Sequence, residues 1–90
     1  MKSNIMQIRL KEERKKIDKI DRNLIILLDQ QAEIALRVGK IKTQNNFAIQ
    51  DLSREKQVLE KTSLARNKLF VENIFKIFIH ESKIMQDNLK

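Results

Sequence analysis

A repeat of apolar positions every seven residues in the first half of the chain most limits what the chain can fold into. The repeated positions are Leu10, Ile17, Leu24, Gln31 and Val38, of which Gln31 alone is polar. A second line of Ile20, Leu27, Ile34 and Ile41 runs between them. This spacing aligns side chains along one side of a helix that pairs with another helix. The pattern predicts a long helix over about residues 6–43.

Such a helix is too long for a chain of this size to cover by itself. At 1.5 Å per residue it would extend roughly 55 Å, which is more than the width of a compact 90-residue domain. We therefore expect a second copy of the chain to cover the remaining apolar line, as a homodimer.

The rest of the chain predicts two further helices in a single domain, residues 1–90. The sequence has no proline and one glycine, so few residues interrupt helical structure. A turn is expected at residues 44–46, and Asp51 can cap a second helix over about residues 51–65. A third helix is expected over about residues 70–88. The predicted fold class is all-α.

Composition excludes several kinds of function. The chain has no cysteine and one histidine, His80, so we expect no disulfide and no metal site. The formal charge of +7 comes from 19 basic and 12 acidic residues, which are interspersed and lack interleaved aromatic residues, so nucleic acid is not the expected partner. The apolar run from Leu24 to Leu28 is too short to span a membrane. We expect a cytoplasmic protein.

Polar side chains interrupt two of the apolar helix faces. Gln31 and Lys42 lie within about 40° of Ala35 and Val38 around the first helix, and Gln86 falls on the apolar face of the third. Burying an amide or an ammonium without a partner is costly. These positions therefore predict a polar, positively charged cavity between helices.

Four segments give the chain a family resemblance. They are RKKIDKID at residues 14–21, IALRVGKIK at 34–42, DLSRE at 51–55 and the stretch from IF at 74–75 through IHES to Gln86. In this order and at this spacing they resemble the three helices of the all-helical chorismate mutases. The resemblance covers nearly the whole chain and implies three helices per chain in an intertwined homodimer.

The resemblance also implies an activity, the rearrangement of chorismate to prephenate in aromatic amino-acid biosynthesis by the shikimate pathway. This isomerase reaction needs no cofactor, metal or nucleophile. The protein must instead hold a flexible dianion in its reactive shape and aim donors at the ether oxygen that gains negative charge.

The same resemblance implies roles for individual residues. Arg14 of the partner chain and Arg54 of the same chain would bind substrate carboxylates, for which planar guanidinium groups are suited. Lys42 and Gln86 would donate to the ether oxygen and are the central catalytic residues. The other implied contacts are Glu55 to the substrate hydroxyl, Asp51 close to it, and Ser82 to a carboxylate.

Gln31 departs from the family pattern, which typically has an arginine there that binds a substrate carboxylate. A charge-assisted hydrogen bond contributes about 1.5 to 3 kcal/mol and a neutral one roughly 1. We therefore expect weaker substrate binding or a slower reaction.

Other readings of these residues stay open. Arg14 could lie on a solvated helix face, Lys42 could extend to solvent at a helix end, and Asp51 could serve only as an N-cap. The chain could be a mutase or a lyase for a chorismate relative, isochorismate or aminodeoxychorismate. It could also be an inactive helical dimer that serves as an interaction or regulatory module, with Gln31 setting the helix register. His80 is read as a structural or surface residue.

Overall fold

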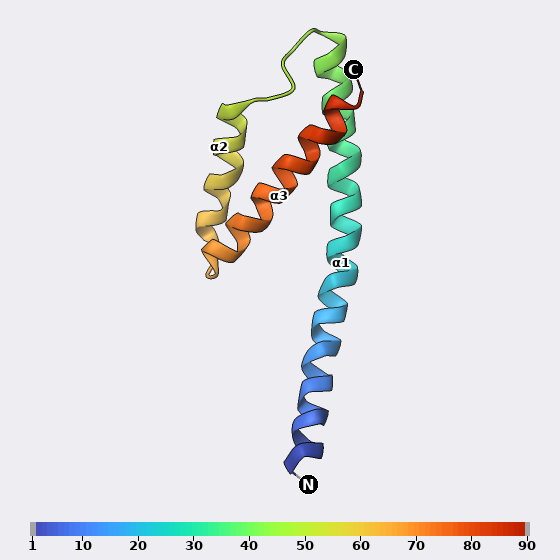
Figure 1. Ribbon diagram of the computed structural model, residues 1–90, viewed down its shortest axis with the longest axis vertical. Helices are drawn as coiled ribbons and strands as arrows, with labels where there is room; N and C mark the ends of the chain where they lie inside the picture. Colours follow the sequence, from blue (N-terminus) through green and yellow to red (C-terminus); the bar gives the residue numbers. More distant parts are fainter. Residues whose placement is uncertain (1, 90) are drawn as a thin grey trace. The chain divides into compact units, whose positions relative to one another are not determined.

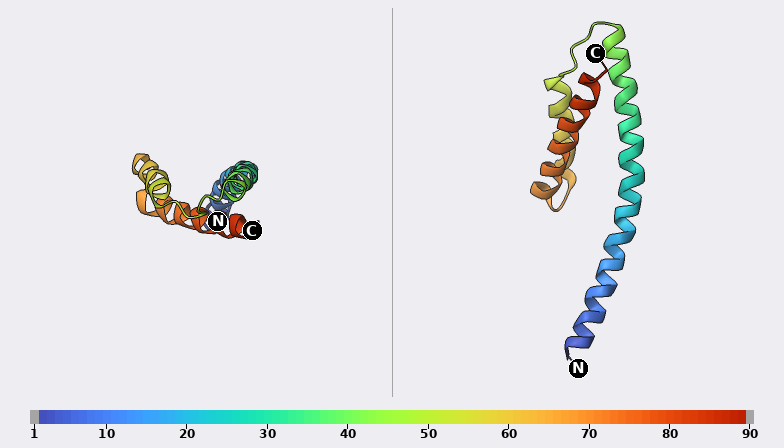
Figure 2. Two further views of the ribbon diagram at one scale, coloured as in Figure 1. Left: turned by 90° about the horizontal axis from the view of Figure 1, so that it is seen from above. Right: turned by 45° about the vertical axis from the view of Figure 1, so that its right-hand side comes forward.

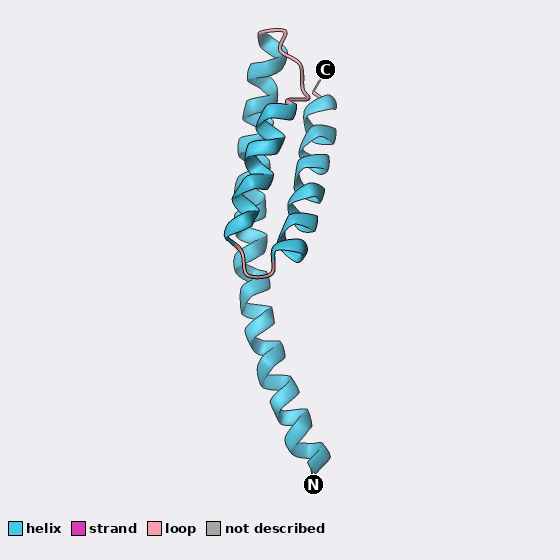
Figure 3. Cartoon of the chain, turned by 90° about the vertical axis from the view of Figure 1, so that its left-hand side faces the viewer, coloured by secondary structure: helices cyan, strands magenta, loops and turns pink. Residues whose placement is uncertain are grey.

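The computed structural model describes residues 2–89 as helices joined by short connections (Figure 1). The elements are α1 (Lys2–Gln44), α2 (Leu52–Lys61), the 3-10 helix η1 (Thr62–Leu64) and α3 (Lys68–Asp87). No strand occurs in this part of the chain (Figure 3). The prediction of an all-α chain with three helices is confirmed. None of the helices described is long and apolar enough to cross a membrane.

Contacts divide the chain into two units, Met1–Gln31 and Ala32–Lys90, and each has its own structure. The first unit is a stretch of α1, in which Glu13 forms an ion pair with Lys16 at 2.9 Å. Apolar side chains of the seven-residue repeat are exposed in this unit, with Leu10 at 48% and Ile17 at 56%. Large apolar side chains on one side of this helix are thus left without cover within the single chain.

In the second unit, α1 ends at Gln44 and is followed by an asparagine in a left-handed conformation. Asn46 has a φ of 58°, a region that asparagine tolerates better than most residues. The amide of Phe47 donates to the Lys42 carbonyl at 2.8 Å, and the amide of Asn46 donates to the Thr43 carbonyl at 3.4 Å. This is the Schellman arrangement, which satisfies the last carbonyls of a helix. The turn predicted at residues 44–46 is found at Asn45 and Asn46, whereas Gln44 still belongs to α1.

Helix α2 begins directly after Asp51, whose side-chain oxygen Oδ1 accepts a hydrogen bond from the Arg54 amide at 3.0 Å. The predicted N-cap is therefore confirmed. At the other end, the buried Thr62 hydroxyl donates to the Leu59 carbonyl at 2.6 Å, and the chain tightens into η1. The helix predicted over residues 51–65 is thus an α-helix followed by a 3-10 turn.

Helix α3 runs back along α2 and η1 (Figure 2). The predicted apolar face of α3 is the less exposed one. The intermediate or buried positions on this face are Val71, Ile74, Phe75, Phe78, Ser82, Met85, Gln86 and Leu89. Phe70 is exposed, so Val71 takes the first position on the face. The helix begins at Lys68, two residues earlier than predicted. Few side chains are well buried. Among the described residues, Ile49 is the one large apolar residue that is buried, with 6% of its surface exposed.

Candidate functional site

The last turns of α3 bring Gln86 against the C-terminal part of α1. Gln86 is 6% exposed, and its Nε2 donates to the Ala35 carbonyl at 2.9 Å. This bond fixes which end of the amide carries the donors, because only the nitrogen can donate. The amide keeps one further N–H and its carbonyl oxygen for another partner.

Gly39 makes this close approach possible. A Cβ built on Gly39 would lie 2.8 Å from Gln86 Cγ and 3.2 Å from Gln86 Cβ. These atoms lie at the base of the Gln86 side chain, so it could not avoid the clash by rotating its tip. Glycine costs up to about 1 kcal/mol relative to alanine inside a helix, and the packing of Gln86 gives a physical reason for its presence.

Lys42 lies one turn beyond Gly39 on α1 and is half-buried. Its Nζ donates to the Ile49 carbonyl at 2.8 Å, so the ammonium is held against the connection between α1 and α2. An ammonium has three donors, and two of them remain for other acceptors. The side chain therefore does not simply extend into solvent at the end of the helix.

The start of α2 holds the second group of predicted residues. Asp51 is exposed and uses one carboxylate oxygen as the N-cap. Arg54 is also exposed, and its Nη1 donates to Gln57 Oε1 at 3.4 Å. Its guanidinium keeps most of its donors for an anion. In the described part of the chain, no hydrogen bond or ion pair joins Arg54 to Lys42 or to Gln86.

Glu55 connects this group to α3. Its carboxylate lies 3.3 Å, through Oε2, from Nζ of Lys83, which also donates to Oε1 at 3.4 Å. The side chain of Glu55 is 23% exposed and that of Lys83 is 31% exposed. The Oε2 atom is buried and accepts no hydrogen bond from the described residues. Its negative charge is balanced by the Lys83 ammonium.

The other predicted site residues are placed as follows. Ser82 is half-buried on α3, one turn before Gln86, whereas His80 is exposed. Arg14 and Gln31 belong to the first unit, and both are exposed. Within the second unit, α3 thus contacts α1 through Gln86 and α2 through Lys83.

Sequence reasoning assigned no role to Lys83, Gly39 or Ile49, although each contacts a predicted site residue. Gly39 had a signal, since a single glycine inside a long helix without other helix breakers needs a reason in packing. No pattern in the sequence marked Lys83 or Ile49, because their contacts depend on how separate segments of the chain meet.

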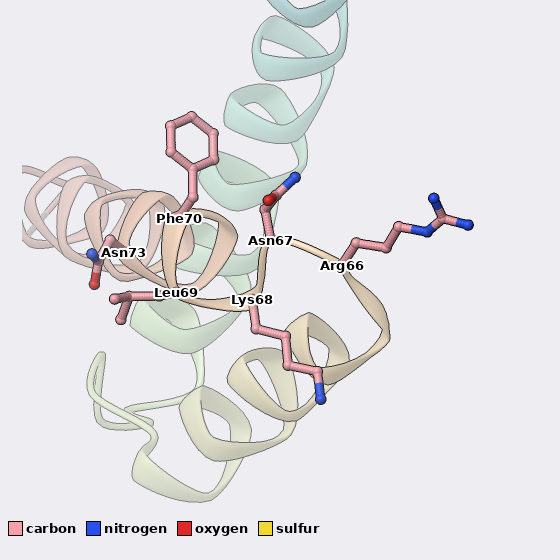
Figure 4. A pocket seen from close by; sticks show the side chains of 6 residues that line it. All are labelled: Arg66, Asn67, Lys68, Leu69, Phe70 and Asn73. Atoms are coloured by element: carbon pink, nitrogen blue, oxygen red, sulfur yellow. The ribbon is translucent and has the colours of Figure 1, made fainter.

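An open depression of about 530 Å³ lies elsewhere, at the connection between α2 and α3. Its lining is formed by Arg66, Asn67, Lys68, Leu69, Phe70 and Asn73. The side chains of Arg66, Lys68 and Phe70 point in different directions and do not converge on one point (Figure 4). None of the predicted site residues lines it. Among residues 2–89 there is also no group of three or more His, Cys, Asp or Glu side chains that could hold a metal ion.

Comparison with known proteins gives a consistent family match. The family model described as "Chorismate mutase type II" matches residues 13–87, a range that contains every predicted site residue. A "Chorismate mutase" of Methanocaldococcus jannaschii is 35% identical over 83 residues, covering 87% of this chain and 84% of that protein. No solved structure gives a significant match.

Other relatives are much longer proteins. A "Bifunctional chorismate mutase/prephenate dehydratase" of Buchnera aphidicola subsp. Schizaphis graminum is 35% identical over 81 residues, which cover 84% of this chain and 21% of the relative. The protein of the same name from Aquifex aeolicus is 44% identical over 52 residues, which cover 58% of this chain and 14% of the relative. The chain thus spans about a fifth of the length of the first of these relatives.

Proposed function

We propose, because the chain belongs to the chorismate mutase type II family, that it catalyses the rearrangement of chorismate to prephenate. One C–O bond breaks and one C–C bond forms within a single molecule, so no group is transferred to the protein. Catalysis consists of holding the reactive shape and stabilising the charge that develops on the ether oxygen.

The observation that carries the proposal is the position of Gln86. A nearly buried amide on α3 lies against Ala35 and Gly39 of α1, and Lys42 follows Gly39 by one helical turn. Both side chains belong to the second unit, and each has donors left for another acceptor. Both are donors that bind an oxygen more strongly as its negative charge grows, which lowers the barrier to reaction.

The remaining roles follow from charge and from free hydrogen-bonding capacity. Arg54 has donors available for a substrate carboxylate, and Glu55 has a partly exposed carboxylate that can accept from the substrate hydroxyl. Asp51 orders the first turn of α2, on which both residues lie. Ser82, on the same face of α3 as Gln86, would bind a carboxylate.

The protein acts as a homodimer in this proposal. The exposed apolar repeat of α1 supports it, because a second copy of α1 is the partner whose repeat has the matching spacing. Arg14 of the partner subunit would complete each of two equivalent sites by binding the second substrate carboxylate. We place the enzyme in the cytoplasm, in aromatic amino-acid biosynthesis.

The neutral side chain of Gln31 favours a second candidate function. It offers a neutral amide where the family resemblance calls for a cation, so the site would bind a dianion less tightly. A site with fewer positive charges suits a chorismate relative, or a dimer that has kept its fold and lost its activity. Product analysis with chorismate, isochorismate and aminodeoxychorismate separates these possibilities.

The central test uses purified protein, chorismate and two lysine variants. Lys42→Ala removes the proposed donor to the ether oxygen, and we expect a loss of at least about 100-fold in kcat with the dimer intact. Lys40→Ala is the matched control, because Lys40 is exposed on the same helix and should keep the parental rate. Chorismate loss and product identity are measured by absorbance and chromatography. A Lys42→Ala protein that keeps the parental rate would exclude the ether-oxygen role.

A further inference from the structure

We infer that Lys83 is a positioning residue of the proposed site, which orients the Glu55 carboxylate and balances its charge. The inference rests on the proposed function and extends it to a residue outside the predicted site. Lys83 directly follows Ser82 on α3, and its ammonium reaches across to α2.

The Lys83 ammonium lies close to both oxygens of the Glu55 carboxylate. Its Nζ donates a hydrogen bond to Oε1 at 3.4 Å and lies 3.3 Å from Oε2, which is buried. A cation that contacts both oxygens restricts the rotation of the carboxylate. Lys83 would therefore set the direction from which Glu55 accepts a substrate hydroxyl.

Charge gives Lys83 a second effect at the same place. The proposed substrate is a dianion, and the Glu55 carboxylate repels it. Both side chains of the ion pair are more than two-thirds shielded from solvent, with exposures of 31% and 23%, so the repulsion would be only partly screened without Lys83.

A purely structural role for the pair makes a different prediction. If Lys83 only ties α3 to α2, its removal should lower the unfolding temperature and leave the kinetic constants of the folded protein unchanged. If it positions Glu55, KM should rise in the folded protein, and the effect should depend on the presence of the Glu55 carboxylate.

The experiment compares Lys83→Met with Lys83→Arg in the full chain. We expect Lys83→Met to lower kcat/KM for chorismate by about tenfold, mostly through KM, and Lys83→Arg to recover most of the loss. In a Glu55→Gln background, Lys83→Met should have little further effect. Lys76→Met is the control, because it removes the same charge from α3, where Lys76 forms a more exposed ion pair with Glu72 at 3.6 Å. This variant should stay within roughly twofold of the parent.

Several results would overturn the inference. An active parent with an unchanged kcat/KM in Lys83→Met would overturn it and leave the proposed function standing. Equal losses in the parent and Glu55→Gln backgrounds would show that Lys83 does not act through Glu55. If Lys83→Met fails to fold, a folded Lys83→Gln with parental kinetics would overturn the inference in the same way. A parent protein that does not convert chorismate would overturn both proposals.

Discussion

Gln31 shows how far one side chain can set the performance of the proposed site. It is an exposed residue of α1 in the single chain, and its amide carries no charge. If a substrate carboxylate binds there, the hydrogen bond is weaker than one from a guanidinium by about 0.5 to 2 kcal/mol. The site would therefore work below the level that the rest of its donors allow.

We predict that Gln31→Arg raises kcat/KM for chorismate by about tenfold, since it would replace a neutral hydrogen bond with a charge-assisted one. Gln30→Arg is the control, because it adds the same charge one position along the helix, on a different face. Steady-state kinetics measure both variants. Equal gains in the two variants would point to general attraction of an anion, and no gain in either would mean that the site is arranged around the amide.

The residues that sequence reasoning placed well are those whose structure depends on near neighbours. Asp51 caps α2 because its side chain reaches an amide three residues ahead, and Asn46 ends α1 through its own backbone conformation. The pair of Lys83 and Glu55 is 28 residues apart, and that of Gln86 and Ala35 is 51 apart. The resemblance could supply Glu55 and Gln86 but not their partners, since these depend on how helices meet.

At the scale of elements, the meeting of α3 with α1 depends on the missing side chain of Gly39. The predicted face of α3 was correct because apolar spacing at three and four residues is a local property. The distance between two helices is not a local property, because it depends on the size of the side chains at their contact. Here that residue is a glycine under Gln86.

We predict that Gly39→Ala lowers kcat about tenfold or more while KM changes little, because the new methyl group displaces Gln86 from Ala35. The higher helix propensity of alanine, up to about 1 kcal/mol, offsets part of the packing strain of about 1 to 3 kcal/mol, so the protein should remain folded. Kinetics and thermal unfolding are measured together. In a Gln86→Ala background, Gly39→Ala should lower kcat much less. A further tenfold loss of kcat in that background would mean that Gly39 does not act through Gln86.

On the scale of the whole molecule, the exposed repeat of α1 links folding to assembly. A single chain leaves Leu10, Ile17 and other large apolar side chains uncovered, which supports the proposed homodimer. The homodimer stays a prediction, made from helix length and the seven-residue repeat. The arrangement of two chains depends on contacts between copies, which the pattern of one chain does not specify.

Mixing two inactive variants tests whether each site draws on both chains. Arg14→Ala and Lys42→Ala should each be inactive as homodimers, but a mixed dimer would contain one intact site. Random pairing makes about half of the dimers mixed, so refolding the two together should restore about a quarter of the parental activity. Lys42→Ala mixed with Gln86→Ala is the control and should restore none, because both residues would come from the same chain. No recovery in the first mixture would contradict the shared site.

The hydrogen bond between Lys42 and the Ile49 carbonyl affects what happens when a ligand arrives. A lysine side chain carries roughly 2 kcal/mol of rotational freedom in its flexible stem, and in this protein the ammonium at its end is already held at 2.8 Å from a backbone oxygen. If Lys42 is the donor to the ether oxygen, the entropy lost in ordering it belongs to folding and not to each catalytic cycle. The short connection after α1 would then contribute to the speed of the reaction through a backbone carbonyl.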